Sequence, residues 1–152
     1  MIGRLIEIFT GQAPQHRHAR SDELQVAVAA LLIEAARTDA GFDTAERTMI
    51  RDLLARRFDL APAETERLLR AAGDAQDRSV EMYRYIRRIT DGYDAEERIE
   101  LIEMLWDVAY ADGTLDPQED ALVRRIAGLV HVSDRERGAA RKRVLARRRL
   151  TA

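Results

Sequence analysis

Apolar residues recur every three or four positions along most of the chain, the spacing that places them on one face of an α-helix. The clearest runs cover residues 24–32, 49–58, 80–89, 99–109 and 122–129. No segment shows the sustained alternation that predicts a half-buried β-strand. The pattern therefore predicts an all-α fold, a compact bundle of seven to eight helices.

Capping residues predict where these helices begin. Pro62 and Pro117 suit the first position of a helix, where the missing N–H costs nothing. In a capping box, the side chain before the helix and the third helical side chain each accept a hydrogen bond from the other's backbone. Five segments fit this pattern: Asp22–Gln25, Asp43–Glu46, Asp94–Glu97, Asp116–Glu119 and Ser133–Glu136.

Two stretches of the sequence resemble each other, which predicts an internal pseudo-twofold repeat. Residues 31–54 align with residues 104–127 at an offset of 73. The acidic pairs that this alignment superposes are Glu34 with Asp107, Asp39 with Asp112, Asp43 with Asp116, and Glu46 with Glu119. Each half is then helix, acidic loop, helix, short turn and helix, over about 24–73 and 94–147, with a bridging helix at about 78–91.

The beginning of the chain has a different pattern. Residues 10–20 mix Gly, Pro and polar side chains and predict a linker. We expect residues 1–20 to form a short amphipathic helix and linker, and residues 21–150 to form the helical domain. No apolar run approaches the ~20 residues that span a bilayer, so we expect a cytoplasmic protein. Membrane association would arise only through partners or through the N-terminal helix, for which docking on the domain is favoured.

The repeated acidic loops are the candidate site. Asp112 is predicted to end one helix and Asp116 to cap the next, so their carboxylates and the free carbonyl groups could converge. Oxygen ligands of this kind suit Ca²⁺, Mg²⁺ or Mn²⁺. The candidate ligands of both loops are Asp39, Asp43, Glu46, Asp112, Asp116 and Glu119. Ordinary capping explains Asp43, Glu46, Asp116 and Glu119 equally well, but it does not explain an acid at a helix end.

The doubled motif, and ADGTLDPQE at residues 111–119 in particular, resembles the tellurite resistance TerB-like family over roughly residues 21–137. The resemblance implies an all-helical module whose acidic loops bind divalent metal. It also implies a stress-linked protein, or a co-chaperone-type module that occurs beside J-domains. Glu34 and Asp107 are weaker additions to the metal ligands. The first copy departs from the motif, because its Gly comes one position later.

Composition excludes several classes of protein. The 152 residues contain no cysteine, which excludes a disulfide scaffold, a Cys-ligated zinc site and a thiol nucleophile. The sequence also lacks the Glu-x-x-His, G-x-G and G-x-S-x-G motifs of di-iron, nucleotide and hydrolase sites. We therefore expect no catalytic residues, and a module that binds protein partners. The alternative is a pure interaction scaffold whose acidic loops are only helix caps.

The charge is unevenly distributed, although the net charge is only −2. Residues 135–152 carry eight basic side chains and one acid, so the rest of the chain is strongly acidic. The basic C-terminal patch comprises Arg141, Lys142, Arg143, Arg147, Arg148 and Arg149. Without interleaved aromatic residues it is a weak signal for nucleic acid, and no nucleic-acid partner is expected.

Overall fold

The computed structural model describes residues 22–37, 44–73 and 78–149, and every regular element within them is a helix. These are a helix at residues 22–36, α2 (Thr44–Phe58), α3 (Pro62–Gly73), α4 (Arg78–Gly92), α5 (Ala95–Ala109), α6 (Pro117–Leu129) and α7 (Asp134–Arg148). The predicted all-α bundle is confirmed, with seven helices in the part of the chain described. The predicted amphipathic helix and linker at residues 1–20 lie outside it.

The helix starts follow the capping residues. Asp94 forms the reciprocal box with Glu97, and Ser133 forms the same box with Glu136. The expected box at Asp116 is only half correct, because its side chain accepts from the N–H of Gln118 instead. Satisfying these free N–H groups explains why the helices begin where they do.

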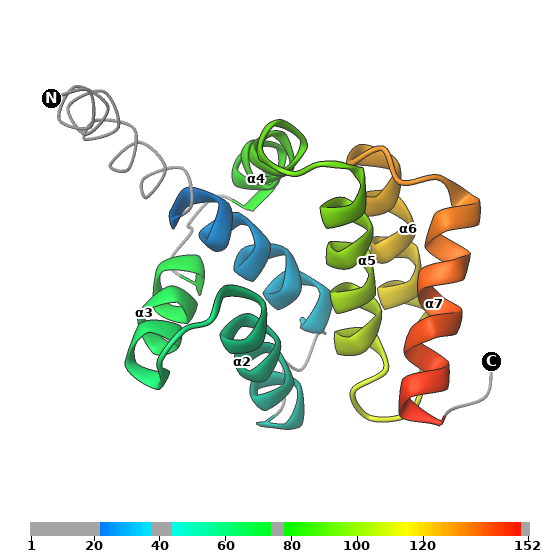
Figure 1. Ribbon diagram of the computed structural model, residues 1–152, viewed down its shortest axis with the longest axis horizontal. Coiled ribbons are helices and arrows are strands. Elements are labelled where there is room, and N and C mark those ends of the chain that lie inside the picture. The colour runs from blue at the N-terminus through cyan, green and yellow to red at the C-terminus, as the bar shows by residue number, and fades with distance from the viewer. Residues whose placement is uncertain (1–21, 38–43, 74–77, 150–152) are drawn as a thin grey trace, which may run out of the picture.

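Two helices occupy the centre of the bundle (Figure 1). The 22–36 helix buries eight of its last ten residues, and α5 buries every residue but one from Leu101 to Ala109. A helix that is buried on nearly every side must be covered by other helices. In Figure 1, α2 and α3 lie on one side of this pair, and α6 and α7 lie on the other side.

The helices fall into two units of three. The N-terminal unit is the 22–36 helix with α2 and α3, and the C-terminal unit is α5, α6 and α7. The 22–36 helix and α5 end 73 positions apart, α2 and α6 begin 73 positions apart, and α3 and α7 begin 72 positions apart. Helix α4 lies between the two units in the sequence, where its apolar spacing predicts a helix.

The second turn of each unit has the same backbone conformation. Asp59, after α2, and His131, after α6, both adopt the left-handed region, with φ of 52° and 62°. The next residue then donates its N–H to a carbonyl five positions earlier, Leu60 to Ala55 at 3.0 Å and Val132 to Ala127 at 2.8 Å. These are Schellman turns built without glycine.

None of the described helices combines the length and the apolar composition that crossing a membrane requires.

Candidate functional site

The loop between α5 and α6 contains two of the predicted ligands. Helix α5 ends at Ala109, and the Tyr110 N–H still bonds to the Trp106 carbonyl at 2.9 Å. The chain then turns through Gly113, whose φ of 89° favours glycine. Asp112 therefore lies within the turn, two residues past Tyr110, and the expectation that it ends the helix is wrong.

The carboxylates of this loop hold its backbone. The Asp112 Oδ1 accepts from the Thr114 N–H at 3.0 Å and from the Thr114 hydroxyl at 3.2 Å. The Asp116 Oδ1 accepts from the Gln118 N–H at 2.7 Å. Both aspartates are exposed. The turn therefore gives Asp112 a structural role that was not predicted from the sequence.

The remaining candidate ligands divide between described and undescribed residues. Glu46 and Glu119 lie half-buried in the first turns of α2 and α6. Asp39 and Asp43 fall outside the described residues. Within the described ranges, no three acidic or histidine side chains form a group that could hold a metal ion. The predicted joining of the two acidic loops thus depends on the segment between the 22–36 helix and α2, and it stays a prediction.

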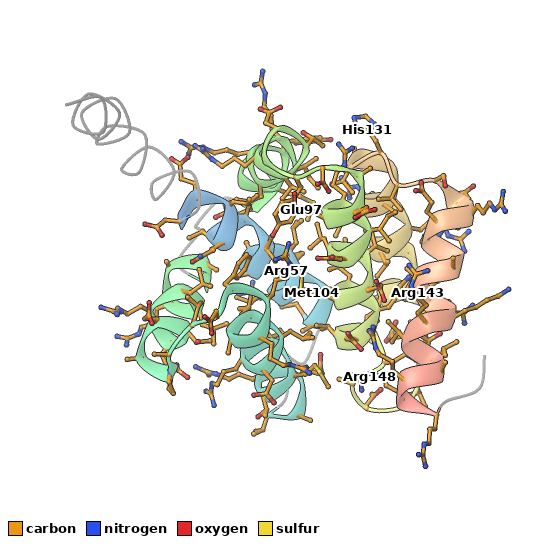
Figure 2. All side chains as sticks on the ribbon, in the orientation of Figure 1. Arg57, Glu97, Met104, His131, Arg143 and Arg148 are labelled. Atoms are coloured by element: carbon orange, nitrogen blue, oxygen red, sulfur yellow. The ribbon has the colours of Figure 1, made fainter. Side chains whose placement is uncertain are left out.

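The weaker candidate Asp107 has a different partner. Its side chain is nearly buried on α5, and its two oxygens bond to Arg147 and Arg148 of α7, each at 3.1 Å. One turn earlier, Glu103 pairs with Arg143 at 3.3 Å and with Arg147 at 3.0 Å. Figure 2 shows Arg143 and Arg148 on α7, the helix beside α5. Asp107 therefore anchors α7.

The sequence spacing carries a signal for this pairing, although it does not show that α5 and α7 pack together. Glu103 and Asp107 lie four residues apart on α5, as do Arg143 and Arg147 on α7, so each pair shares one helix face. When two helices pack with these faces in contact, the carboxylates of one helix form ion pairs with the guanidinium groups of the other. The C-terminal arginines were interpreted as a basic patch, and their match to the acids of α5 was not predicted.

A fourth arginine of α7 stacks on the core. The Arg141 guanidinium lies 5.8 Å from the ring centres of both Trp106 and Tyr110, and its Nε donates to the Tyr110 hydroxyl at 2.7 Å. Trp106 is 1% exposed and donates its ring N–H to the Arg137 carbonyl at 3.2 Å. Four of the six residues of the basic C-terminal patch are thus engaged within the fold.

A charged cluster joins the two units at α2 and α5. Arg57 contacts Glu97 at 3.5 Å and Glu100 at 3.4 Å, and it lies 5.4 Å from the centre of the Tyr93 ring (Figure 2). Burial raises the pKa of Tyr93 to about 12; Arg57 opposes this rise, while the two glutamates add to it. The Tyr93 hydroxyl has no hydrogen-bond partner among the described residues. Arg57 thus joins α2 to the start of α5 through two ion pairs and a contact with the Tyr93 ring.

Comparison with known proteins agrees with this fold. No curated protein matches the sequence. A crystal structure of a protein of unknown function, PG1108 from Porphyromonas gingivalis W83, superposes with a TM-score of 0.60 at 20% identity, covering 80% of this chain and 95% of that one. At that identity the likeness shows the fold alone. The model of the family "Tellurite resistance protein TerB" matches residues 25–142. Since that match spans most of the sequence, the chain belongs to the TerB family.

Proposed function

We propose that this TerB-family chain is a non-enzymatic module that takes up a divalent cation at its acidic interhelical loops and works through protein partners. The family description, tellurite resistance, supports a stress-related setting for this proposal. The proposed ligands are Asp39, Asp43, Glu46, Asp112, Asp116 and Glu119.

The α5–α6 loop carries the metal proposal. Asp112 and Asp116 are exposed, and backbone N–H groups orient one oxygen of each carboxylate. Oriented carboxylates lose little freedom when they bind an ion, and carboxylate oxygens are what Ca²⁺, Mg²⁺ and Mn²⁺ prefer. A complete site needs further ligands, which the first acidic loop would supply.

Calorimetric titration with Ca²⁺, Mg²⁺ and Mn²⁺ tests the metal proposal. Wild type should give a saturable heat with at least one cation, and the double variant Asp112→Asn/Asp116→Asn should bind at least about tenfold more weakly. Asparagine still accepts the same backbone bonds, so stability should change by less than about 0.5 kcal/mol. Asp94→Asn is the matched control, because it caps the opposite end of α5 and should leave the heat unchanged.

A second candidate is an interaction scaffold whose acidic loops are only helix caps. It is favoured by the hydrogen bonds of Asp112 and Asp116 to backbone N–H groups. Under this candidate no cation gives heat with wild type. Replacing both aspartates by alanine then lowers stability, by about 1 kcal/mol for the helix cap at Asp116 and by a similar amount for the turn that Asp112 holds, yet the variant captures the same partners in a pull-down. Equal heats for wild type and the Asn double variant would also reject cation binding at this loop.

A further inference from the structure

A cavity of about 220 Å³ opens in the N-terminal unit, between the 22–36 helix, α2 and α3. Each of these three segments contributes one arginine to its wall: Arg37 directly after the first helix, Arg47 on α2 and Arg70 on α3. Figure 1 shows the three helices meeting on one side of the molecule. Three positive groups from three separate segments thus face one space.

The rest of the wall is apolar. Ile33, Ile50 and Leu69 are all buried side chains of the core, and they line the cavity with the arginines. Gly73 completes the wall at the end of α3, and a Cβ built there would meet nothing within 4 Å. The cavity therefore combines a cationic wall, an apolar surface and open space beside Gly73.

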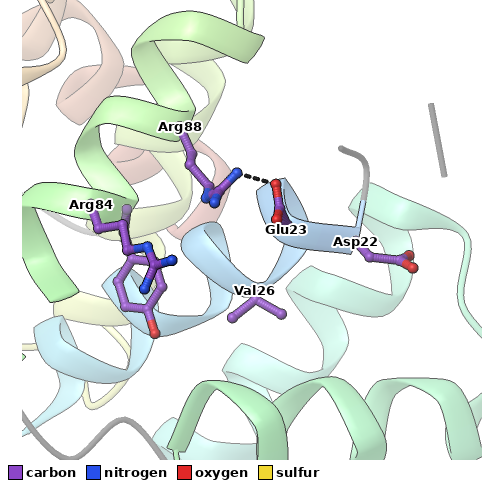
Figure 3. A pocket seen from close by; sticks show the side chains of 6 residues that line it. Asp22, Glu23, Val26, Arg84 and Arg88 are labelled. Atoms are coloured by element: carbon purple, nitrogen blue, oxygen red, sulfur yellow. Dashed lines mark hydrogen bonds and ion pairs between the residues drawn. The ribbon is translucent and has the colours of Figure 1, made fainter. Parts of the chain in front are cut away.

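Among the described residues, no acid lines this cavity and no carboxylate forms an ion pair with Arg37, Arg47 or Arg70. The cavity between the 22–36 helix and α4 is different (Figure 3). Its wall carries both signs of charge, and Glu23 bonds to Arg88 across it. Of these two cavities, only the first has described walls that carry positive charge without a carboxylate.

Helix electrostatics explain two of the three arginines but not the third. Arg37 and Arg70 lie at helix C-terminal ends, where a positive charge is favourable. Arg47 lies in the first turn of α2, where a positive charge is unfavourable. An unfavourable cation that lines a cavity with two others indicates a site for negative charge.

We propose that this cavity binds a small oxyanion that carries a short apolar group. The guanidinium groups offer paired N–H donors that match the oxygens of a phosphate or a carboxylate. The carbon part of the ligand would cover the apolar wall formed by Ile33, Ile50 and Leu69. An aromatic phosphate monoester and an aromatic carboxylate share this chemistry, and the test separates them.

Titration with phenyl phosphate, benzoate and inorganic phosphate tests the proposal, with calorimetry for affinity and amide NMR shifts for location. A Tris chloride buffer freed of divalent ions by a chelating resin keeps the result independent of the cation proposal. Phenyl phosphate or benzoate should bind saturably and shift the amides of the residues that line the cavity. Phenyl phosphate should bind about tenfold more tightly than inorganic phosphate, because its ring is transferred from water to the apolar wall of the cavity.

Arginine variants complete the test. Arg47→Gln/Arg70→Gln should weaken binding at least about tenfold, because two charge-assisted contacts are lost. Arg56→Gln/Arg135→Gln changes the net charge equally at two exposed positions outside the cavity and should bind within about twofold of wild type. Equal binding by the two double variants, or no saturation by either aromatic anion at about 10 mM, overturns the proposal.

Discussion

The N-terminal and C-terminal units space their helices alike but use their arginines differently. In the C-terminal unit, Arg143, Arg147 and Arg148 pair with acids of the central helix α5. In the N-terminal unit, Arg47 and Arg70 face an open cavity. In the same three-helix arrangement, arginines can therefore form ion pairs between helices or remain available to bind a ligand. The N-terminal unit also has an ion pair between helices, Arg51 of α2 with Glu66 of α3, but Arg47 and Arg70 remain directed to the cavity.

Core truncation should separate the units most strongly. Trp106→Ala removes a ring that is 1% exposed, together with its bond to Arg137 and its stacking with Arg141, and should cost about 3–5 kcal/mol in urea unfolding. The matching position is Ile33, 6% exposed beside the cavity, and Ile33→Ala should cost about 2–3 kcal/mol. A larger loss at Ile33 than at Trp106 would contradict this expected order.

The second largest difference is expected for the aligned acids Asp107 and Glu34, whose substitution should cost different amounts of stability. Asp107→Asn leaves Arg148 with a poorer partner in a nearly buried position, and should cost about 1–3 kcal/mol. The contribution of the Asp107–Arg147 ion pair to this loss is small, because water screens the exposed Arg147 side chain. Glu34→Gln should cost less than about 0.5 kcal/mol, because no described residue forms an ion pair with Glu34. Urea midpoints measure the change in the free energy of unfolding for both variants. Equal losses would contradict the different roles of Asp107 and Glu34.

The junction between the units should respond to alkaline pH. Because the pKa of Tyr93 is about 12 in the fold and about 10 in the unfolded chain, the unfolded chain loses this proton first. Its contribution to stability is complete below pH 10 and is lost as the pH rises to 12. Between pH 8 and pH 11, the titration of Tyr93 should lower the free energy of unfolding of wild type by about 1 kcal/mol, and Tyr93→Phe should abolish this loss. Tyr83→Phe, at a ring that is 62% exposed, is the control and should retain that loss.

The smallest effect should be the same in both units. Asp59→Gly and His131→Gly place glycine where φ is positive, and each should raise thermal stability by about 0.5–1 kcal/mol. Gly113→Ala is the opposite change, at a φ of 89° with open space around the added carbon, and should lose about 1 kcal/mol. If only one of the two turns gains stability, the turns differ in more than their shared backbone conformation.

Helix starts could be predicted from this sequence because their causes are local. Asp94, Asp116 and Ser133 each cap a helix through groups no more than three residues away, and Pro62 and Pro117 begin helices. The end of α5 was predicted less well, because Ala109 carries no stop signal and Gly113 acts only after a further turn. The acids at helix ends therefore pointed to function more strongly than the structure of the α5–α6 loop supports.

The charge pairs could not be predicted in the same way, because they join distant segments. Asp107 meets residues about forty positions away, and the cavity arginines come from three segments. The family resemblance directed attention to the acidic loops, and sequence spacing gives no indication that Arg37, Arg47 and Arg70 line one wall.

The position of α7 in the sequence has a consequence for synthesis. Helix α5 is made before α7, yet α7 provides the arginines for Glu103 and Asp107 and the apolar residues Val144 and Leu145 that complete the core. While the ribosome is still translating the intervening residues, the acids and the apolar face of α5 stay open to water and to other chains. This interval is when aggregation or chaperone binding would compete with folding. Variants that weaken α7 should therefore lower the yield of soluble protein in cells more than their equilibrium stability implies.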